Sequence, residues 1–179
     1  LGCDVDGRKL GELKRRARRA GATTVQAIEL PPMQPGAPPP PMPDALAPLE
    51  GRAERVLVDA PCTGVGALRR NPEARWRLVP DDLRRLPELQ LAIALRALDF
   101  VAPGGRLIYA TCTVLRAENQ GVVERLMAAR PGLELVSPRE IWGAARGTPL
   151  CDATGSFLEV LPHKHGTDGF FAAVLRRRA

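Results

Sequence analysis

Short runs of aliphatic and β-branched residues alternate along this chain with longer segments of helical periodicity. Runs typical of strands lie at 1–5, 23–30, 55–59, 106–111, 133–136, 156–161 and 170–175, and segments typical of helices lie at 8–19, 81–101 and 118–129. Parallel strands need a crossover, usually a helix, to reach their neighbours. The alternation therefore predicts a doubly wound α/β sheet. The Val and Leu residues at 55–59 predict a strand that is buried on both faces.

The longest predicted helix, at 81–101, has apolar side chains at helical spacing. We expect its inward face to consist of Leu83, Leu86, Leu89, Ile93 and Leu98. The tripeptide Pro103-Gly104-Gly105 follows directly. Glycine and proline are common just after helix ends, so this tripeptide is predicted to end the helix.

Proline dominates residues 31–48, with four consecutive prolines from Pro38 to Pro41. Such a segment supports neither a β-ladder nor a helix, because proline lacks the backbone N–H that both require. We interpret it as a surface insertion between two elements of the same domain. A polyproline segment that binds an aromatic groove is the alternative. At 179 residues the whole chain is the size of one domain.

The chain is basic, with 26 Lys and Arg against 20 Asp and Glu and a net charge of +6. This balance favours a partner with a phosphate backbone or another anionic surface. The predicted helix at 8–19 places Leu10 and Leu13 inward and carries seven basic residues: Arg8, Lys9, Lys14, Arg15, Arg16, Arg18 and Arg19. These form either a solvated outer face or a contact with an RNA backbone.

Four cysteines, Cys3, Cys62, Cys112 and Cys151, are scattered without CxxC spacing. No signal peptide and no long apolar run accompanies them. This pattern predicts a protein of the reducing cytoplasm, with no membrane partner and no metal. A lone cysteine in that compartment is usually a small buried hydrophobic residue, so a reactive one needs further support.

Polar residues follow the first four predicted strands. Asp4 follows the first and Glu29 the second, Asp59 and Cys62 follow the third, and Cys112 follows the fourth. Ligands of an open α/β sheet bind at the carboxyl ends of its strands, so we expect these five residues along one rim. An acidic residue in such a position often accepts hydrogen bonds from a ribose, which predicts this role for Asp4. A helix cap is the alternative.

Three motifs follow one another along the chain: VLVDAPCTG at 56–64, LIYATCT at 107–113 followed by Glu118-Asn119, and HKHGTDGFFAAVL at 163–175. Together they closely resemble the motifs of the Fmu/Sun/Nop-type RNA cytosine-C5 methyltransferases. The segment Arg69-Arg70-Asn71-Pro72 with Arg75-Trp76 is similar to the bacterial branch that acts on 16S ribosomal RNA. The resemblance covers nearly the whole chain apart from the proline-rich segment.

The resemblance implies a Rossmann-like sheet that uses S-adenosylmethionine, with residues 1–179 as part of a catalytic domain. It implies RNA, most specifically ribosomal RNA, as the partner and 5-methylcytosine as the product. Cys112 would be the attacking thiol and Cys62 would assist release of the product. Asp59 would hold the cytosine edge or the methionine end of the cofactor, Asp4 the ribose, and Glu29 the adenine side, where the family usually has Asp.

The chemistry itself explains why a cysteine is needed. Cytosine C5 is a poor nucleophile, so an enzyme first adds a thiolate to C6 and creates an enamine whose C5 attacks an activated methyl group. A base must then remove the C5 proton and the thiolate must leave. One covalent intermediate thus divides a difficult step into easier ones.

Positive charge and an aromatic ring come together at Arg69, Arg70, Arg75 and Trp76. Proteins that bind single-stranded nucleic acids combine these two features, so we expect these residues to contact RNA. For Trp76, a place in the hydrophobic core is the alternative.

Three further alternatives stay open. DNA cytosine-C5 methyltransferases use the cysteine of a Pro-Cys pair, which here is Pro61-Cys62. The two cysteines also fit a purely structural role at strand ends. Finally, the glycine-rich, lysine-bearing loop of the family is expected upstream of Leu1, so the chain alone is expected to bind S-adenosylmethionine weakly. A catalytically inactive RNA-binding remnant is the resulting alternative function.

Overall fold

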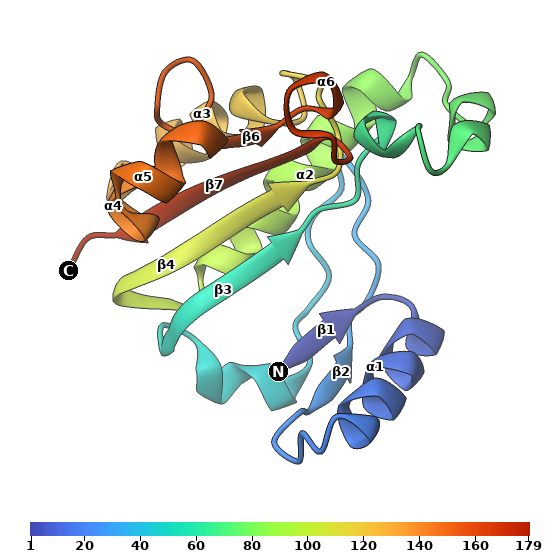
Figure 1. Cartoon of the computed structure of the whole chain (residues 1–179). Helices are drawn as coiled ribbons and strands as arrows, with labels where there is room; N and C mark the ends of the chain where they lie inside the picture. The colour runs from blue at the N-terminus through green and yellow to red at the C-terminus, as the bar shows by residue number, and fades with distance from the viewer. The chain divides into compact units, whose positions relative to one another are not determined.

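A computed structural model describes all residues, 1–179, and shows the predicted alternation of strands and helices (Figure 1). The chain forms two compact units, Leu1–Leu49 and Glu50–Ala179. None of its helices combines the length and the apolar character needed to cross a membrane.

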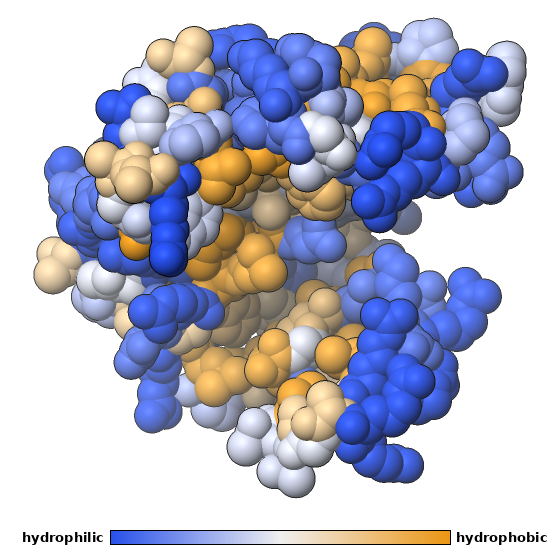
Figure 2. All heavy atoms as spheres, viewed as in Figure 1, coloured by the Kyte–Doolittle hydropathy of each residue, from blue (hydrophilic) through white to orange (hydrophobic).

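The first unit is built on two short parallel strands, β1 (Gly2–Asp4) and β2 (Ala27–Glu29), joined by α1 (Gly7–Arg19). Asp4 and Glu29 are paired in register at the carboxyl ends of the two strands. The strand predicted at 23–30 is thus shorter than expected. On α1, Leu10 is buried, and the outer surface of the helix is almost entirely hydrophilic (Figure 2, lower right).

The proline-rich segment contains one regular element that the sequence analysis excluded. Residues 31–43 form no helix or strand, as predicted, but η1 (Asp44–Leu49) is a 3-10 helix. It begins after the last closely spaced proline, and the Leu46 N–H donates to the Pro43 carbonyl at 2.9 Å. Pro48 lies near its end. Such a short helix needs few backbone donors, so proline is tolerated there.

The second unit contains a five-stranded sheet of order β3-β4-β7-β5, with β6 paired to β7. The strands are β3 (Ala53–Asp59), β4 (Val101–Thr111), β5 (Leu133–Val136), β6 (Leu158–Val160) and β7 (Phe170–Arg177). β3 and β4 are parallel, whereas β7 runs antiparallel to β4, β5 and β6. The last strand of the chain therefore lies inside the sheet (Figure 1).

Two helices cover the core of this unit. α2 (Asp82–Leu98) packs against β3 and β4 and against α3 (Gln120–Ala129). The core between them includes Ala94, Leu107, Val122 and Leu126. The shorter helices are η2 (Val65–Ala67), η3 (Pro72–Trp76), α4 (Pro138–Trp142), α5 (Ala144–Gly147), η4 (Thr148–Leu150) and α6 (Pro162–His165), none of which was predicted.

The structure corrects the predicted limits and inward face of the long helix. α2 ends at Leu98, and Pro103-Gly104-Gly105 lies within β4, where the pairing with β3 shifts register. The tripeptide therefore marks an irregularity in a strand. Leu83 is 52% exposed. Leu86 and Leu98 are buried as predicted, and the fully buried stripe continues at i, i+4 spacing through Gln90 and Ala94.

The prediction that the strand at 55–59 is buried on both faces is also wrong. Val58 is buried against the core, but Leu57 on the opposite face is 67% exposed. β3 pairs only with β4 and lies at the edge of its sheet, and α2 packs on the side of Val58.

Candidate active site

The sulfur atoms of Cys62 and Cys112 lie 3.4 Å apart at the carboxyl ends of β3 and β4. The two strands are parallel with Asp59 opposite Ala110, and the Ala60 N–H donates to the Ala110 carbonyl at 2.9 Å. The pairing thus extends one residue beyond β3. The structure brings together the two cysteines that the sequence places at neighbouring strand ends.

The two thiols differ in acidity. The hydrogen bond from Cys62 lowers the pKa of Cys112 to about 7, although burial and the charges of Asp59 and Glu118 act in the opposite direction. The hydrogen bond to Cys112, followed by burial, raises the pKa of Cys62 far above its ordinary range. Cys112 is therefore the thiol of the pair that ionises near neutral pH, and Cys62 is the one that stays protonated and donates to the thiolate.

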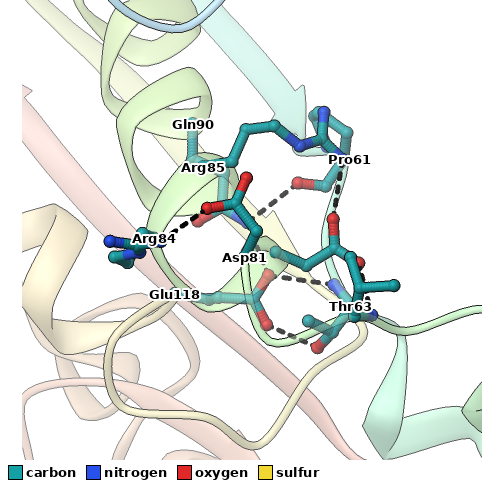
Figure 3. Close-up of polar contacts among 9 residues, drawn as sticks. Pro61, Thr63, Asp81, Arg84, Arg85, Gln90 and Glu118 are labelled. Atoms are coloured by element: carbon teal, nitrogen blue, oxygen red, sulfur yellow. Dashed lines mark hydrogen bonds and ion pairs between the residues drawn. The ribbon is translucent and has the colours of Figure 1, made fainter.

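Beneath the thiol pair lies Glu118, whose side chain is completely buried. Its carboxylate accepts the Thr63 N–H at 2.9 Å, the Thr63 hydroxyl at 2.5 Å and the Gln90 amide at 3.0 Å. Figure 3 shows Gln90 reaching from α2 toward Glu118 and toward the Pro61 carbonyl, to which it donates at 2.8 Å. The residues on both sides of Cys62 are thus bound to this network.

Asn119 holds the residues on both sides of Cys112. The Thr111 hydroxyl donates to Asn119 Oδ1 at 2.6 Å, and Asn119 Nδ2 donates to the Thr113 carbonyl at 3.1 Å. The Thr113 hydroxyl lies 3.0 Å from the Thr63 hydroxyl, which links the two cysteine segments directly. Because Glu118 and Asn119 make these contacts from a turn, α3 begins at Gln120 and not at the predicted residue 118.

Sequence reasoning assigned no role to these supporting residues. Glu118-Asn119 was part of a motif, but neither residue was given a function. For Gln90 a signal exists, since it is a polar residue in the middle of the buried i, i+4 stripe of α2. A polar residue in that position needs a buried hydrogen-bond partner.

A close backbone contact joins the third motif to the cysteines. The Gly66 N–H donates to the Cys112 carbonyl at 3.0 Å, and the Gly169 N–H donates to the Gly66 carbonyl at 2.8 Å. A β-carbon on Gly66 would lie 2.4 Å from the Gly169 carbonyl oxygen, so only glycine fits there. All three motifs quoted above therefore meet within one unit of the structure.

The predicted RNA-contacting residues lie on the segment that follows Cys62. Arg69 and Arg70 are exposed and both form ion pairs with Asp168, at 3.7 and 3.2 Å. The guanidinium of Arg75 lies 4.5 Å from the centroid of the Trp76 ring. Trp76 is 77% exposed, so its alternative interpretation as a core residue is wrong.

The predicted cofactor residues are found at strand ends in both units. Asp4 accepts the Asp6 N–H at 2.9 Å, and Lys9 lies 3.7 Å from its other oxygen. The N-cap of α1 is Asp6, so the alternative role of Asp4 as a cap is wrong. A β-carbon on Gly7 would lie 2.9 Å from the Glu29 carboxylate. Asp59 ends β3 in the second unit and is exposed. One common rim for all five residues stays a prediction.

The sequence matches a known protein family and several of its curated members. The family described as 16S rRNA methyltransferase RsmB/F matches residues 3–176. Ribosomal RNA small subunit methyltransferase B of Thermus thermophilus is 40% identical over 136 residues, which are 75% of this chain and 32% of the relative. The protein of the same name from Klebsiella pneumoniae is 35% identical over 125 residues, 70% of this chain and 26% of the relative. The chain thus spans about a third or less of the length of these relatives.

Solved structures share the fold over almost the whole chain. The crystal structure of the protein PH0851 matches with a TM-score of 0.79 and 30% sequence identity. The match includes 98% of this chain and 36% of PH0851. The crystal structure of NSun6 from Pyrococcus horikoshii with SFG matches with a TM-score of 0.70 and 26% sequence identity. The match includes 99% of this chain and 41% of the NSun6 chain. These likenesses confirm the predicted Rossmann-like methyltransferase fold.

Proposed function

Because the chain belongs to the 16S rRNA methyltransferase RsmB/F family, we propose that it takes part in methyl transfer from S-adenosylmethionine to C5 of a cytosine in 16S ribosomal RNA. The observation that carries the proposal is the pair of thiols at 3.4 Å, one of which has a pKa lowered to about 7. Residues 1–179 are taken as part of one catalytic domain with an insertion at 31–48.

The residues present fit the proposed cofactor in the chemistry of their atoms. Asp4 and Glu29 offer carboxylate acceptors at paired strand ends, and ribose hydroxyls and the adenine amine are donors. Asp59 offers a further carboxylate, which suits the ammonium group of the methionine end. When bound, S-adenosylmethionine supplies an electrophilic methyl group. Its analogue SFG accompanies the related NSun6 structure.

In the proposed reaction the Cys112 thiolate forms a bond to C6 of the cytosine and pushes an electron pair onto C5. After C5 has gained the methyl group, its proton leaves, the C5–C6 double bond returns, and the bond between C6 and the Cys112 sulfur breaks. The lowered pKa of Cys112 supports this assignment, because a thiolate, not a thiol, is the nucleophile. The raised pKa of Cys62 argues against the DNA-type alternative.

Cys62 is suited to assist the release step. Its pKa is raised mainly by the hydrogen bond to Cys112. When the Cys112 sulfur forms its bond to C6 it loses its negative charge, so it no longer accepts a strong hydrogen bond that keeps the proton on Cys62. Cys62 can then give up its own proton to water, with burial still raising its pKa, and the resulting thiolate accepts the C5 proton. Both steps need free thiols, which fits a reducing cytoplasm.

The isotope content of the product tests the reaction itself. We expect the full product of the gene to release one tritium for each methyl group transferred to 16S RNA that carries cytidine tritiated at C5. Only methylation at C5 displaces that hydrogen. Methyl transfer without tritium release would place the reaction at another atom and overturn the proposal. RNA binding with neither event would favour the inactive remnant.

RNA binding is expected to depend steeply on salt, because Arg69 and Arg70 have exposed side chains on the segment after Cys62 and share a single carboxylate, that of Asp168. For single-stranded RNA, a plot of the logarithm of the binding constant against the logarithm of the salt concentration has a negative slope, and each lost phosphate contact makes it shallower by about 0.7. Arg70→Ala should show this change in fluorescence anisotropy titrations.

A matched control removes the same charge elsewhere. Arg125 on α3 is paired with Glu88 at 2.8 Å, and Arg125→Ala is expected to leave the slope nearly unchanged. Equal slopes for Arg70→Ala and the unchanged protein would remove this arginine from the RNA surface.

A further inference from the structure

The two cysteines come from separate segments of the chain, and the residues that follow them are tied together below the thiols. Cys62 lies in the loop after β3, which is not part of the sheet, whereas Cys112 directly follows β4. Thr63 and Thr113, the next residues along the chain, lie hydroxyl to hydroxyl at 3.0 Å. The distance between the sulfur atoms therefore depends on what holds the Cys62 loop in place.

Glu118 accepts most of the hydrogen bonds that keep the Cys62 loop in place. It accepts two hydrogen bonds from Thr63 and one from Gln90, whose amide also donates to the Pro61 carbonyl. Pro61 and Thr63 are the immediate neighbours of Cys62. Three donors converge on Glu118, and an ionised carboxylate is the side chain that only accepts. The buried charge is therefore satisfied by hydrogen bonds, as its complete burial requires.

We propose that Glu118 is a positioning residue that keeps the Cys62 thiol within hydrogen-bonding distance of the Cys112 sulfur, as the geometry of its three accepted hydrogen bonds indicates. The inference rests on the proposed function for its catalytic meaning, but the geometry of the thiol pair exists without it. Glu118 touches neither sulfur, and it acts through Thr63 and the loop.

The electrostatic effect of Glu118 has the opposite sign, which makes the two roles separable. The negative charges of Glu118 and Asp59 both raise the pKa of Cys112, and only the hydrogen bond from Cys62 and a weaker backbone hydrogen bond lower it. Removing the charge alone therefore lowers the pKa of Cys112. Removing the hydrogen bonds that Glu118 makes to the Cys62 loop raises the pKa of Cys112, because the hydrogen bond from Cys62 is then lost. The direction of the shift decides between the roles.

The experiment measures the rate of Cys112 alkylation by iodoacetamide as a function of pH, resolved from the other cysteines by peptide mass spectrometry. We expect the midpoint for Glu118→Ala to rise by more than about one pH unit toward the ordinary cysteine value of about 8.5. Glu118→Gln removes the charge and keeps the shape and one acceptor oxygen for Thr63 N–H and Gln90, while the Thr63 hydroxyl can accept from the new amide, so its midpoint should stay or fall. Glu124→Ala removes an exposed glutamate of α3 and should change nothing.

A second pair of variants decides the matter if Glu118→Ala does not fold. Thr63→Val removes the hydroxyl that donates to Glu118 and keeps the shape, and its midpoint should rise by a smaller amount. Thr63→Ser keeps the hydroxyl and should match the unchanged protein. A midpoint that falls or stays constant in Glu118→Ala, or in Thr63→Val, overturns the inference. Alkylation does not require methyl transfer, so this result is independent of whether the proposed function holds.

Discussion

Replacing Cys62 by alanine in the full product of the gene is expected to leave a covalent adduct between protein and RNA that survives denaturing electrophoresis. Cys112 still attacks C6 in this variant, but the group proposed to assist release is gone. The intermediate therefore accumulates until most of the enzyme is trapped, and multiple turnover stops. The measurement is the fraction of protein shifted by radiolabelled 16S RNA in the presence of S-adenosylmethionine.

The pH dependence of adduct formation provides an internal check. In the unchanged protein we expect the reaction of Cys112 to rise with pH and to level off above about 7, the lowered pKa of this thiol. Cys62→Ala also removes the hydrogen bond that lowers this pKa, so its adduct should form faster at about pH 9 than at about pH 7. Cys151→Ala is the matched control, since Cys151 donates to the Gly147 carbonyl outside the thiol pair. No adduct in Cys62→Ala at either pH contradicts the assignment of Cys62 to release.

The thiol pair could be predicted from the sequence because one physical rule determines it. β3 and β4 are parallel neighbours, so their carboxyl ends lie side by side, and each end is followed within a few residues by a cysteine. Likewise, the family motifs could be placed on strand ends before any coordinates were known. What the rule does not give is the 3.4 Å distance, which depends on side chains from α2 and from the turn before α3.

The parts that could not be predicted depend on contacts between residues far apart in the sequence. β7 lies between β4 and β5 and runs antiparallel to both, and local periodicity contains no information on strand order. Pro103-Gly104-Gly105 has the composition of a helix end, but the pairing with β3 places it in a strand irregularity. In both cases tertiary pairing decides over local preference.

Replacing Cys112 by alanine is expected to abolish methyl transfer, with a loss of at least about a thousand-fold, because removing a nucleophile removes the covalent route itself. Cys62 is not expected to substitute for it, since burial still raises the pKa of its thiol when Cys112 is absent. The tritium release assay on 16S RNA measures the loss, and denaturing electrophoresis should show no adduct.

The contrast between the two cysteine variants separates the competing nucleophiles. If Cys112 attacks, Cys112→Ala is inactive without an adduct and Cys62→Ala is inactive with one. If Cys62 attacks, as in the DNA-type enzymes, the two patterns are exchanged. The acidity of the pair favours the first outcome, because Cys112 has a pKa near neutrality whereas that of Cys62 is raised far above its ordinary range. An adduct in Cys112→Ala, with none in Cys62→Ala, would therefore show that Cys62 is the nucleophile.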